Sequence, residues 1–259
     1  MNLNLNQKVV VVTGGAKGIG EGICEVLAEE GAVVAMIGRN ETDNRATEQR
    51  LRALGGQVFS FKAELTEPDA CQAVIAQIAD QFGRIDGLVN NAGINDGVGL
   101  ETGDYESFIS SLHRNLVHYY LMAQYALPFL KISKGAIVNI SSKTAETGQG
   151  GTSGYAASNG GRNALTREWA VELLPYGIRV NAVVVAECYT PLYEKWIQTL
   201  PNPEEALENI LRKIPLERRM TTTREIADMV AFLISERSSH TTGQLIHVDG
   251  GYVHLDRSI

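Results

Sequence analysis

The sequence predicts one α/β domain, a doubly wound parallel sheet of seven strands with helices on both faces. Short runs rich in β-branched residues alternate with longer segments whose apolar residues recur at every third or fourth position. The short runs are apolar almost throughout, which is typical of strands covered on both faces of a parallel sheet. A glycine-rich turn follows the first run and opens a helical segment. This alternation of strand and helix is expected of an open parallel sheet.

Each expected element follows from its local pattern. The seven strands are the β-branched runs at Val9–Val12, Val33–Ile37, Val58–Lys62, Gly87–Asn90, Ala136–Ile140, Arg179–Val184 and Leu245–Val248. The helices are the amphipathic segments at Ile19–Glu30, Thr42–Leu54, Asp69–Phe82, Tyr105–Leu127, Tyr155–Leu174 and Glu225–Ser235. Residues 187–222 break the alternation and contain Trp196 and several prolines. The length of this insertion predicts a helical lid over the site.

Length, charge and cysteine content limit the class of protein. The chain of 259 residues can bury one large core, so residues 1–259 are expected to form a single domain. The net charge is −7 without a block of lysine or arginine, so neither nucleic acid nor an anionic membrane is an expected partner. No apolar segment is long enough for a signal peptide or a membrane span. Cys24, Cys71 and Cys188 form no CxxC pair, so we expect reduced thiols in a cytoplasmic protein.

The glycine-rich turn after the first strand predicts a nucleotide site. Gly14, Gly18 and Gly20 let the backbone approach a pyrophosphate, and the helix that begins there stabilises the negative charge. Lys17 and Ile19 lie in the same turn. A tight strand-to-helix turn without a ligand is the alternative. The position of the glycines directly after an apolar strand favours a Rossmann-like dinucleotide site.

The end of the second strand indicates which nicotinamide cofactor binds. Proteins that bind NAD place an acidic residue there, and it accepts hydrogen bonds from the ribose hydroxyls. Gly38 occupies that position here, and Arg39 follows it. No carboxylate would repel a 2′-phosphate, whereas Arg39 and Lys17 could hold one. NADP is therefore the expected cofactor and NAD the alternative; Arg39 as a solvated turn residue would remove the preference.

Ser142 and Tyr155, thirteen residues apart, supply the two groups that hydride transfer from an alcohol requires. Together with the glycine turn and the run Asn90–Gly93, they resemble the short-chain dehydrogenase/reductase family over essentially the whole chain. The resemblance implies that Tyr155 is the base and Ser142 the oxyanion donor. It further implies that Asn115 kinks its helix and holds a relay water. The alternatives are a serine that caps a helix and an Asn115 that is an interior polar residue.

The same resemblance assigns the remaining cofactor contacts. It implies that Glu64 and Leu65 contact the adenine and that the nicotinamide ribose lies against Tyr155 and Asn159. Three residues after the fourth strand would brace the sheet beside the adenosine ribose: Asn91, Ala92 and Gly93. Thr190, at the start of the lid, completes this set.

Asn159 departs from the family pattern, which has lysine four residues after the tyrosine. That lysine binds the nicotinamide ribose, and its charge lowers the tyrosine pKa from about 10 toward working pH. Asparagine can still bind the ribose but supplies no charge. An engineered substitution, a natural relative of low activity, and a second cation acting instead are the three explanations. Lys143 is the nearest such cation in the sequence, although adjacent strand residues point to opposite faces.

The segment that begins the lid, and the C-terminal run from Asp249 to Arg257, resemble the L-fucose dehydrogenase branch of the family. The resemblance implies oxidation of an aldose such as L-fucose at its anomeric carbon, which gives a lactone. A sugar pocket needs many polar groups and an aromatic ring that stacks on the sugar. The expected substrate residues are Asn95, Ser142, Lys143, Gln149, Tyr155, Glu187, Tyr193 and Trp196. The alternatives are a carbonyl reductase of another small polar substrate, and an NADP(H)-binding protein whose turnover is impaired by Asn159.

Assembly is expected to follow the family as well. Helices Tyr105–Leu127 and Tyr155–Leu174 resemble the pair that forms its dimer face, which implies a homotetramer. The tail Tyr252–Ile259 would lie near a neighbouring subunit, with His254, Asp256 and Arg257 in terminal packing or a subunit contact. No histidine has a metal-like neighbourhood in the sequence, so no metal is assigned.

Overall fold

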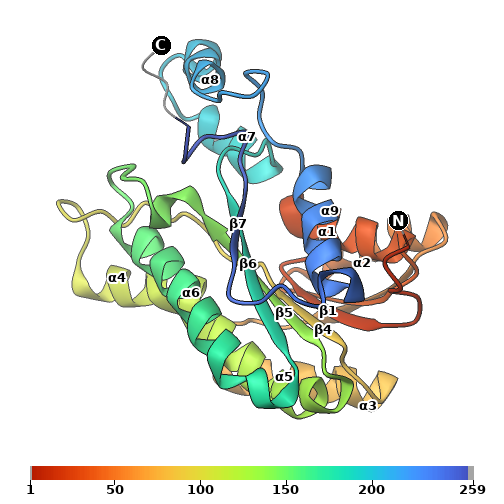
Figure 1. Cartoon of the computed structure of the whole chain (residues 1–259). Helices are drawn as coiled ribbons and strands as arrows, with labels where there is room; N and C mark the ends of the chain where they lie inside the picture. The colour runs from red at the N-terminus through yellow and green to blue at the C-terminus, as the bar shows by residue number, and fades with distance from the viewer. Residues whose placement is uncertain (1, 256–259) are drawn as a thin grey trace.

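A computed structural model describes residues 2–255 and contains one parallel sheet (Figure 1). The strand order is β3-β2-β1-β4-β5-β6-β7, which reverses direction between β1 and β4. The predicted doubly wound sheet is confirmed, and each predicted strand ends within two residues of the observed one. The strands are β1 (Val9–Thr13), β2 (Val33–Gly38), β3 (Gln57–Lys62), β4 (Gly87–Asn90), β5 (Ala136–Ser142), β6 (Arg179–Val185) and β7 (Leu245–Val248).

Helices cover both faces of the sheet (Figure 1). One face carries α1 (Gly18–Glu29), α2 (Glu41–Ala53) and α9 (Thr223–Ile234), and the other carries α3 (Pro68–Phe82), α5 (His118–Ser133) and α6 (Ser153–Glu172). Successive strand residues alternate between these layers, as the period of two requires. Val10 and Val12 belong to the core beneath α1 and α9, whereas Val9 and Val11 belong to the core beneath α3 and α5.

The helix predicted at Tyr105–Leu127 is longer than expected and is interrupted. It consists of α4 (Tyr105–Leu112), a π-helical turn at His113–Val117, and α5, which continues to Ser133. The predicted end at Leu127 was wrong because Pro128 lies inside α5. Proline removes one helical hydrogen bond. The full burial of Leu130 in the next turn offsets that loss and keeps the helix intact.

Residues 187–222, which the sequence predicts to be a helical lid, contain two short helices, α7 (Pro191–Ile197) and α8 (Pro203–Arg212), and their role as a lid stays a prediction. Both lie beyond one end of the sheet (Figure 1). Ile197 and Ile214 are buried and anchor this segment, whereas α8 has no fully buried residue. None of the helices described in residues 2–255 is long and apolar enough to cross a membrane.

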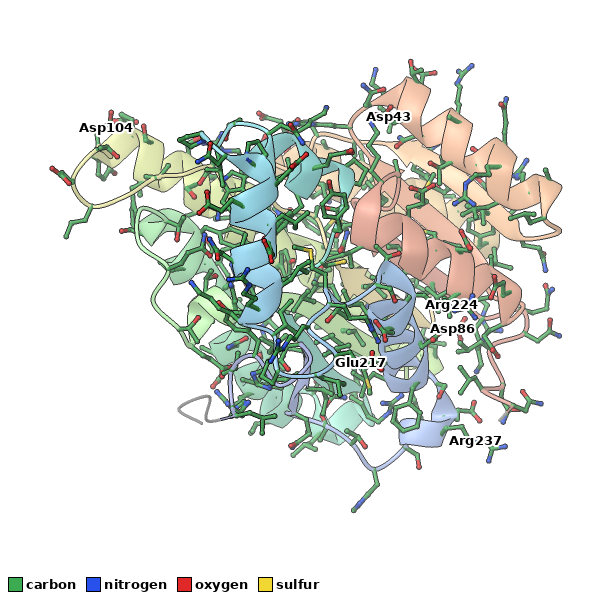
Figure 2. The ribbon with its side chains drawn as sticks, turned by 90° about the horizontal axis from the view of Figure 1, so that it is seen from above. Asp43, Asp86, Asp104, Glu217, Arg224 and Arg237 are labelled. Atoms are coloured by element: carbon green, nitrogen blue, oxygen red, sulfur yellow. The ribbon has the colours of Figure 1, made fainter. Side chains whose placement is uncertain are left out.

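Helix α9, which follows residues 187–222, begins with a well-defined N-cap. The Thr222 hydroxyl accepts from the backbone N–H of Glu225, and the Glu225 carboxylate accepts from the N–H of Thr222, which is a capping box. Hydrogen bonds from Arg219 and from Thr222 lower the pKa of Glu225 to about 2. Arg224, two residues after Thr222, lies beside α1 (Figure 2) and donates to Glu29 over 2.6 Å. The root of the lid is therefore held against α1.

Buried His118, just after the π turn, should make stability depend on pH. Its Nε2 lies 3.0 Å from the Arg114 carbonyl, and burial, reinforced by the positive charge of Arg162, lowers the His118 pKa from 6.5 to about 4. The unfolded chain therefore takes up a proton near pH 6.5, and the folded chain does so only near pH 4. The unfolding free energy should fall as pH drops through this window, with a slope approaching about 1.4 kcal/mol per pH unit.

Urea denaturation between pH 7 and pH 4.5 checks this expectation. His118→Gln should flatten the pH dependence, because glutamine keeps a donor for the Arg114 carbonyl and does not titrate. His113→Gln, at an exposed position of the same turn, is the matched control and should behave like the unmodified protein. An unchanged slope in His118→Gln would contradict the assignment.

Candidate active site

A cavity of about 620 Å³ lies at the carboxyl ends of the strands. Its volume is in the range of small-molecule and cofactor sites. Residues that follow β1, β2, β4, β5 and β6 line it, and residues of α7 line one side. The strand order reverses between β1 and β4, which is where open α/β sheets bind ligands.

The glycine turn forms the cradle that a pyrophosphate needs. Gly14 and Gly18 have positive φ angles of 65° and 59°. A Cβ atom at Gly20 would lie 2.1 Å from the Gly14 carbonyl oxygen, so only glycine fits there. Lys17, the N-cap residue of α1, makes no side-chain cap, which leaves the first backbone N–H groups of α1 available to an anion. These features fit a dinucleotide phosphate.

Asn91 braces this cradle from β4. Its Nδ2 donates to the Thr13 carbonyl over 2.9 Å and to the Gly14 carbonyl over 3.2 Å. Its backbone N–H donates to the Thr13 hydroxyl over 2.9 Å. The side chain that the sequence assigned to a cofactor contact is thus bonded to the end of β1.

A carboxylate lies beside the loop after β2, contrary to the expectation from the sequence. No carboxylate was expected there, but Asp43, which lies on α2 (Figure 2), lines the cavity and pairs with Lys17 over 2.7 Å. The reason is local: α2 begins only two residues after Arg39, and its first turn faces the glycine loop. Arg39 also lines the cavity and is exposed, and it forms no ion pair within residues 2–255.

Asn44 was missed by sequence reasoning. A Cβ atom at Gly38 would lie 2.1 Å from the Asn44 Oδ1, so an acidic residue at position 38 has no room while Asn44 stays in place. The Asn44 Nδ2 donates to the Gly38 carbonyl over 2.9 Å and to the Phe61 carbonyl over 3.3 Å. The Oδ1 is buried and has no hydrogen-bond partner in the described part of the chain, which suits an acceptor for a ribose hydroxyl. No pattern in the sequence marks this residue.

Ser142 and Tyr155 reach the same cavity from different elements. Ser142 is the last residue of β5, and Tyr155 lies in the first turn of α6. The Ser142 oxygen accepts from the Thr144 backbone N–H over 3.3 Å, which leaves its hydroxyl proton free to donate. A donor and a phenol therefore face one space, as hydride transfer from an alcohol requires.

Asn115 and Asn159 do not reach the cavity with the others. Asn159 is fully buried; its Nδ2 donates to the Tyr155 carbonyl over 2.8 Å, and its Oδ1 accepts from Arg162 over 2.9 Å. Asn115 is also fully buried, and its side chain bonds the Ile94 N–H and the Ser111 carbonyl. The ribose contact of Asn159 and the relay water of Asn115 stay predictions, and the side-chain polar atoms of both residues are bonded within the protein.

Arg162 lines the cavity and was not singled out in the sequence. Its guanidinium carbon lies 5.9 Å from the centre of the Tyr155 ring. A signal was present, since residue 162 follows residue 155 by seven positions. Two helical turns place both residues on one face of α6.

The remaining cofactor residues expected from the sequence line the cavity. They are Gly14, Lys17, Gly18, Ile19, Gly20, Arg39, Glu64, Leu65, Asn91, Ala92, Gly93, Tyr155 and Thr190. Of the expected substrate residues, the lining includes Asn95, Ser142, Tyr155 and Tyr193. Lys143, Gln149, Glu187 and Trp196 are absent from that lining within the described part of the chain.

Lys143 and Glu187 instead form a buried ion pair behind the cavity wall. The Tyr193 hydroxyl donates to Glu187 over 2.8 Å, and the Tyr252 ring lies 4.1 Å from the Lys143 ammonium. Burial, together with the charge of Glu187, raises the pKa of Tyr193, so Tyr193 remains a neutral donor. The charge of Lys143 is thus directed at Glu187, and not at Tyr155.

Two of the histidines lie in a metal-like neighbourhood that was not expected from the sequence. Glu146, His247 and His254 bring three metal-type ligand atoms within 4.8 Å of one another, although the sequence suggested no such neighbourhood. The His247 Nε2 lies 3.1 Å from the Glu146 carboxylate. The pairing of β5, β6 and β7 brings together residues that are about a hundred positions apart. These three could hold a metal ion, but they lie outside the cavity lining. Asp256 and Arg257 lie outside the described residues.

Comparison with known proteins gives consistent matches over nearly the whole chain. A family model described as enoyl-(acyl carrier protein) reductase matches residues 14–253. A 3-oxoacyl-(acyl-carrier-protein) reductase of Thermotoga maritima is 37% identical and covers 97% of this chain and 100% of that protein. An L-fucose dehydrogenase of Oryctolagus cuniculus is 36% identical and covers 94% of this chain and 84% of that protein.

A solved structure is similar to the same extent. The ligand-free aldohexose dehydrogenase of Thermoplasma acidophilum has a TM-score of 0.90 and 30% sequence identity. The match covers 100% of this chain and 99% of that one. Similarity at this level extends to the arrangement of the elements that carry the cavity.

Proposed function

The chain belongs to the short-chain dehydrogenase/reductase family, an oxidoreductase family that uses NAD(P), and we propose that it oxidises an aldose such as L-fucose. The oxidised atom is the anomeric carbon, and the product is the lactone. The observation that carries the oxidoreductase part is the meeting of the glycine cradle, Ser142 and Tyr155 in one cavity. The sugar part rests on the polar cluster around Glu187 and on the similarity to two sugar dehydrogenases.

The proposed reaction divides the work between two side chains. Tyr155, as phenolate, takes the proton from the anomeric hydroxyl while the carbon–oxygen bond becomes a carbonyl. Ser142 donates a hydrogen bond to that oxygen and steadies its charge. A bound nicotinamide would supply the acceptor for the hydride that leaves the anomeric carbon. The proton and the hydride together account for the two hydrogens that the substrate loses.

Two alternative functions can be compared with aldose oxidation. The similarity to the Thermotoga reductase favours reduction of another small polar carbonyl compound. A protein that binds NADP(H) without turnover is favoured by Asn159 alone. The polar groups beside the cavity argue for a substrate with several hydroxyls, since a site built to bond hydroxyls rejects ligands that leave its polar groups unpaired.

Substrate preference is expected to depend on Glu187. The unmodified protein should reduce NAD(P)⁺ faster with aldoses than with simple alkyl alcohols. Glu187→Gln keeps the size of the side chain but removes the charge that orients Tyr193, so the KM for L-fucose should rise roughly tenfold. Steady-state kinetics with a panel of aldoses measure both effects.

Glu194→Gln is the matched control, because Glu194 is exposed on α7, the helix that carries Tyr193. It should leave the KM unchanged. Faster turnover of a steroid or an alkyl alcohol than of any aldose would refute the sugar assignment. Preferential reduction of an oxoacyl thioester would favour the second function.

We infer a preference for NADP over NAD, weakened by Asp43. Arg39 is free to bind a 2′-phosphate, whereas the charge of Lys17 is partly neutralised by its ion pair with Asp43. Arg39→Ala should lower NADPH affinity roughly tenfold and leave NADH affinity nearly unchanged. Asp43→Asn should increase the preference for NADPH. Fluorescence titration of both reduced cofactors gives the dissociation constants.

Arg45→Ala is the control for the loss of an exposed arginine, because Arg45 lies on α2 and pairs with Glu41 outside the cavity. It should leave both dissociation constants unchanged. Equal affinity of the unmodified protein for NADPH and NADH would contradict the inference.

The proposed assembly is a homotetramer that uses the outer face of α6. Ala157 and Ala164 are exposed on this helix, and Gly160 between them has open space around it. Small residues at this spacing allow the helix of a second copy to approach closely. Tyr120 on the neighbouring α5 is about half exposed and would be covered in the same contact.

Light scattering at micromolar concentration should give the mass of a tetramer. Ala164→Glu should reduce that mass, because a charge would be buried in the helix contact. Ala46→Glu, at an exposed position of α2 on the other side of the sheet, should leave the mass unchanged. A monomer at this concentration would refute the proposed assembly.

The cysteines support the proposed cytoplasmic location. Cys24, Cys71 and Cys188 are all free and buried. Burial raises the pKa of Cys71 to about 11 and that of Cys188 to about 12, so both remain protonated thiols. Thiols of this kind persist in a reducing compartment.

A further inference from the structure

Arg162 is a charged side chain that is 3% exposed and has no carboxylate partner among residues 2–255. Protein oxygens take the place of water around it. Its Nε donates to the Asn115 carbonyl over 2.7 Å, and one terminal nitrogen donates to the Ile140 carbonyl over 3.2 Å and to the Asn159 Oδ1 over 2.9 Å. All of these partners are neutral. The positive charge of Arg162 is therefore solvated but not cancelled.

This charge lies between two tyrosine rings. The guanidinium carbon is 4.3 Å from the centre of the Tyr119 ring and 5.9 Å from that of Tyr155. The second terminal nitrogen faces Gly93, where an added Cβ atom would lie only 2.8 Å away. Gly93, Tyr155 and Arg162 all line the cavity. The guanidinium thus lies at the wall of the proposed nicotinamide site.

The neighbouring charges are engaged elsewhere. Arg114 pairs with Asp96 over 3.3 Å, Lys17 pairs with Asp43, and Lys143 pairs with Glu187. The remaining titratable groups that line the cavity are Arg39, Glu64, Cys188, Tyr193 and Lys195. Buried Tyr119 and His118 lie behind Arg162. Arg162 is the cation in contact with the Tyr155 ring within the described chain.

We propose that Arg162 supplies to Tyr155 the positive charge that a lysine at position 159 supplies in relatives, and that Asn159 holds this guanidinium in place. The proposal rests on the proposed function, in which Tyr155 is the base. Under this proposal the protein stays active although position 159 holds asparagine and not lysine. The Asn159 Oδ1 is an acceptor for Arg162, whereas a lysine there would set two cations against each other.

The role is electrostatic, because a guanidinium does not release its proton in proteins. Arg162 acts through Tyr155 as a positioning residue and favours the phenolate. The same charge acts on the groups behind it, since Arg162 is among the causes that lower the pKa of His118. The protein is therefore expected to be active near neutral pH with asparagine at position 159.

Arg162→Met tests the proposal, since methionine keeps much of the volume and removes the charge. Tyrosinate absorbance, taken as the difference from the same background carrying Tyr155→Phe, reports Tyr155 ionisation without any substrate. We expect the Tyr155 transition to lie at higher pH in Arg162→Met than in the unmodified protein, because the nearby positive charge is lost. With aldose, kcat at pH 7 should fall roughly 10- to 100-fold, and the acidic limb of the kcat profile should shift by the same amount.

A reciprocal variant separates charge from scaffolding. Asn159→Lys alone should lower kcat, because it places an ammonium where Arg162 needs an acceptor. Asn159→Lys combined with Arg162→Leu restores one cation beside Tyr155 and should recover most of the kcat and the original pH limb. Arg162→Lys, which keeps the charge, should shift the Tyr155 transition less than Arg162→Met.

Arg179→Met is the matched control. Arg179 also donates chiefly to backbone carbonyls, those of Leu233, Ile234 and Ser235, but it lies on β6 away from the cavity. This variant should lower thermal stability and leave the pH profile unchanged. Thermal melts of every variant identify any loss of folding.

The outcomes are distinct. An unshifted Tyr155 transition in folded Arg162→Met, or a double variant that folds but recovers nothing, overturns the proposal. If Tyr155 shifts as expected but no aldose, alcohol or carbonyl compound is turned over, the role of Arg162 stands and the proposed function fails. If Asn159→Lys raises kcat many-fold, the site lacks a cation and the proposal is wrong.

Discussion

A guanidinium that is buried without a counter-ion among residues 2–255 is the constraint around which the centre of this structure is arranged. A charge removed from water must be surrounded by oriented dipoles, because leaving it unsolvated costs several kcal/mol or more. Arg162 finds these dipoles at the Asn115 carbonyl of the π turn, at the Ile140 carbonyl of β5 and at the Asn159 amide of α6. Gly93 leaves the necessary space. Elements from four parts of the chain are held together at one point beside Tyr155.

This arrangement explains the presence of the π turn. Single π-helical turns inside α-helices occur mostly at functional sites. At His113–Val117 the turn places the Asn115 carbonyl toward Arg162 and the Asn115 side chain toward the Ile94 N–H. Asn115 therefore links the loop after β4 to α6 from the protein interior. A regular helix would change the direction of both groups.

The sheet determines where such a site can form. Helices cover both faces, so ligands can reach the strands only at their ends. Ser142 arrives there on β5, and the glycine cradle arrives on β1. The lid is joined to this edge through Glu187, which is bonded both to Lys143 after β5 and to Tyr193 on α7. A polar cluster thus connects the cavity wall with the segment that carries α7.

The sequence by itself determined the strands, most helix bounds and the glycine-rich turn, whereas Ser142 and Tyr155 were identified through the resemblance to a family. These features depend on local periodicity or on short spacings, which the chain displays directly. Only the tertiary structure decided the partners of Arg162, the ion pair of Asp43 and the group Glu146, His247 and His254. Their contacts join residues from different elements, and strand order and helix packing set those distances. The sequence showed that Asn159 departs from the family pattern. Its contact with Arg162 depends on how α6, β5 and the π turn pack together, so only the tertiary structure revealed it.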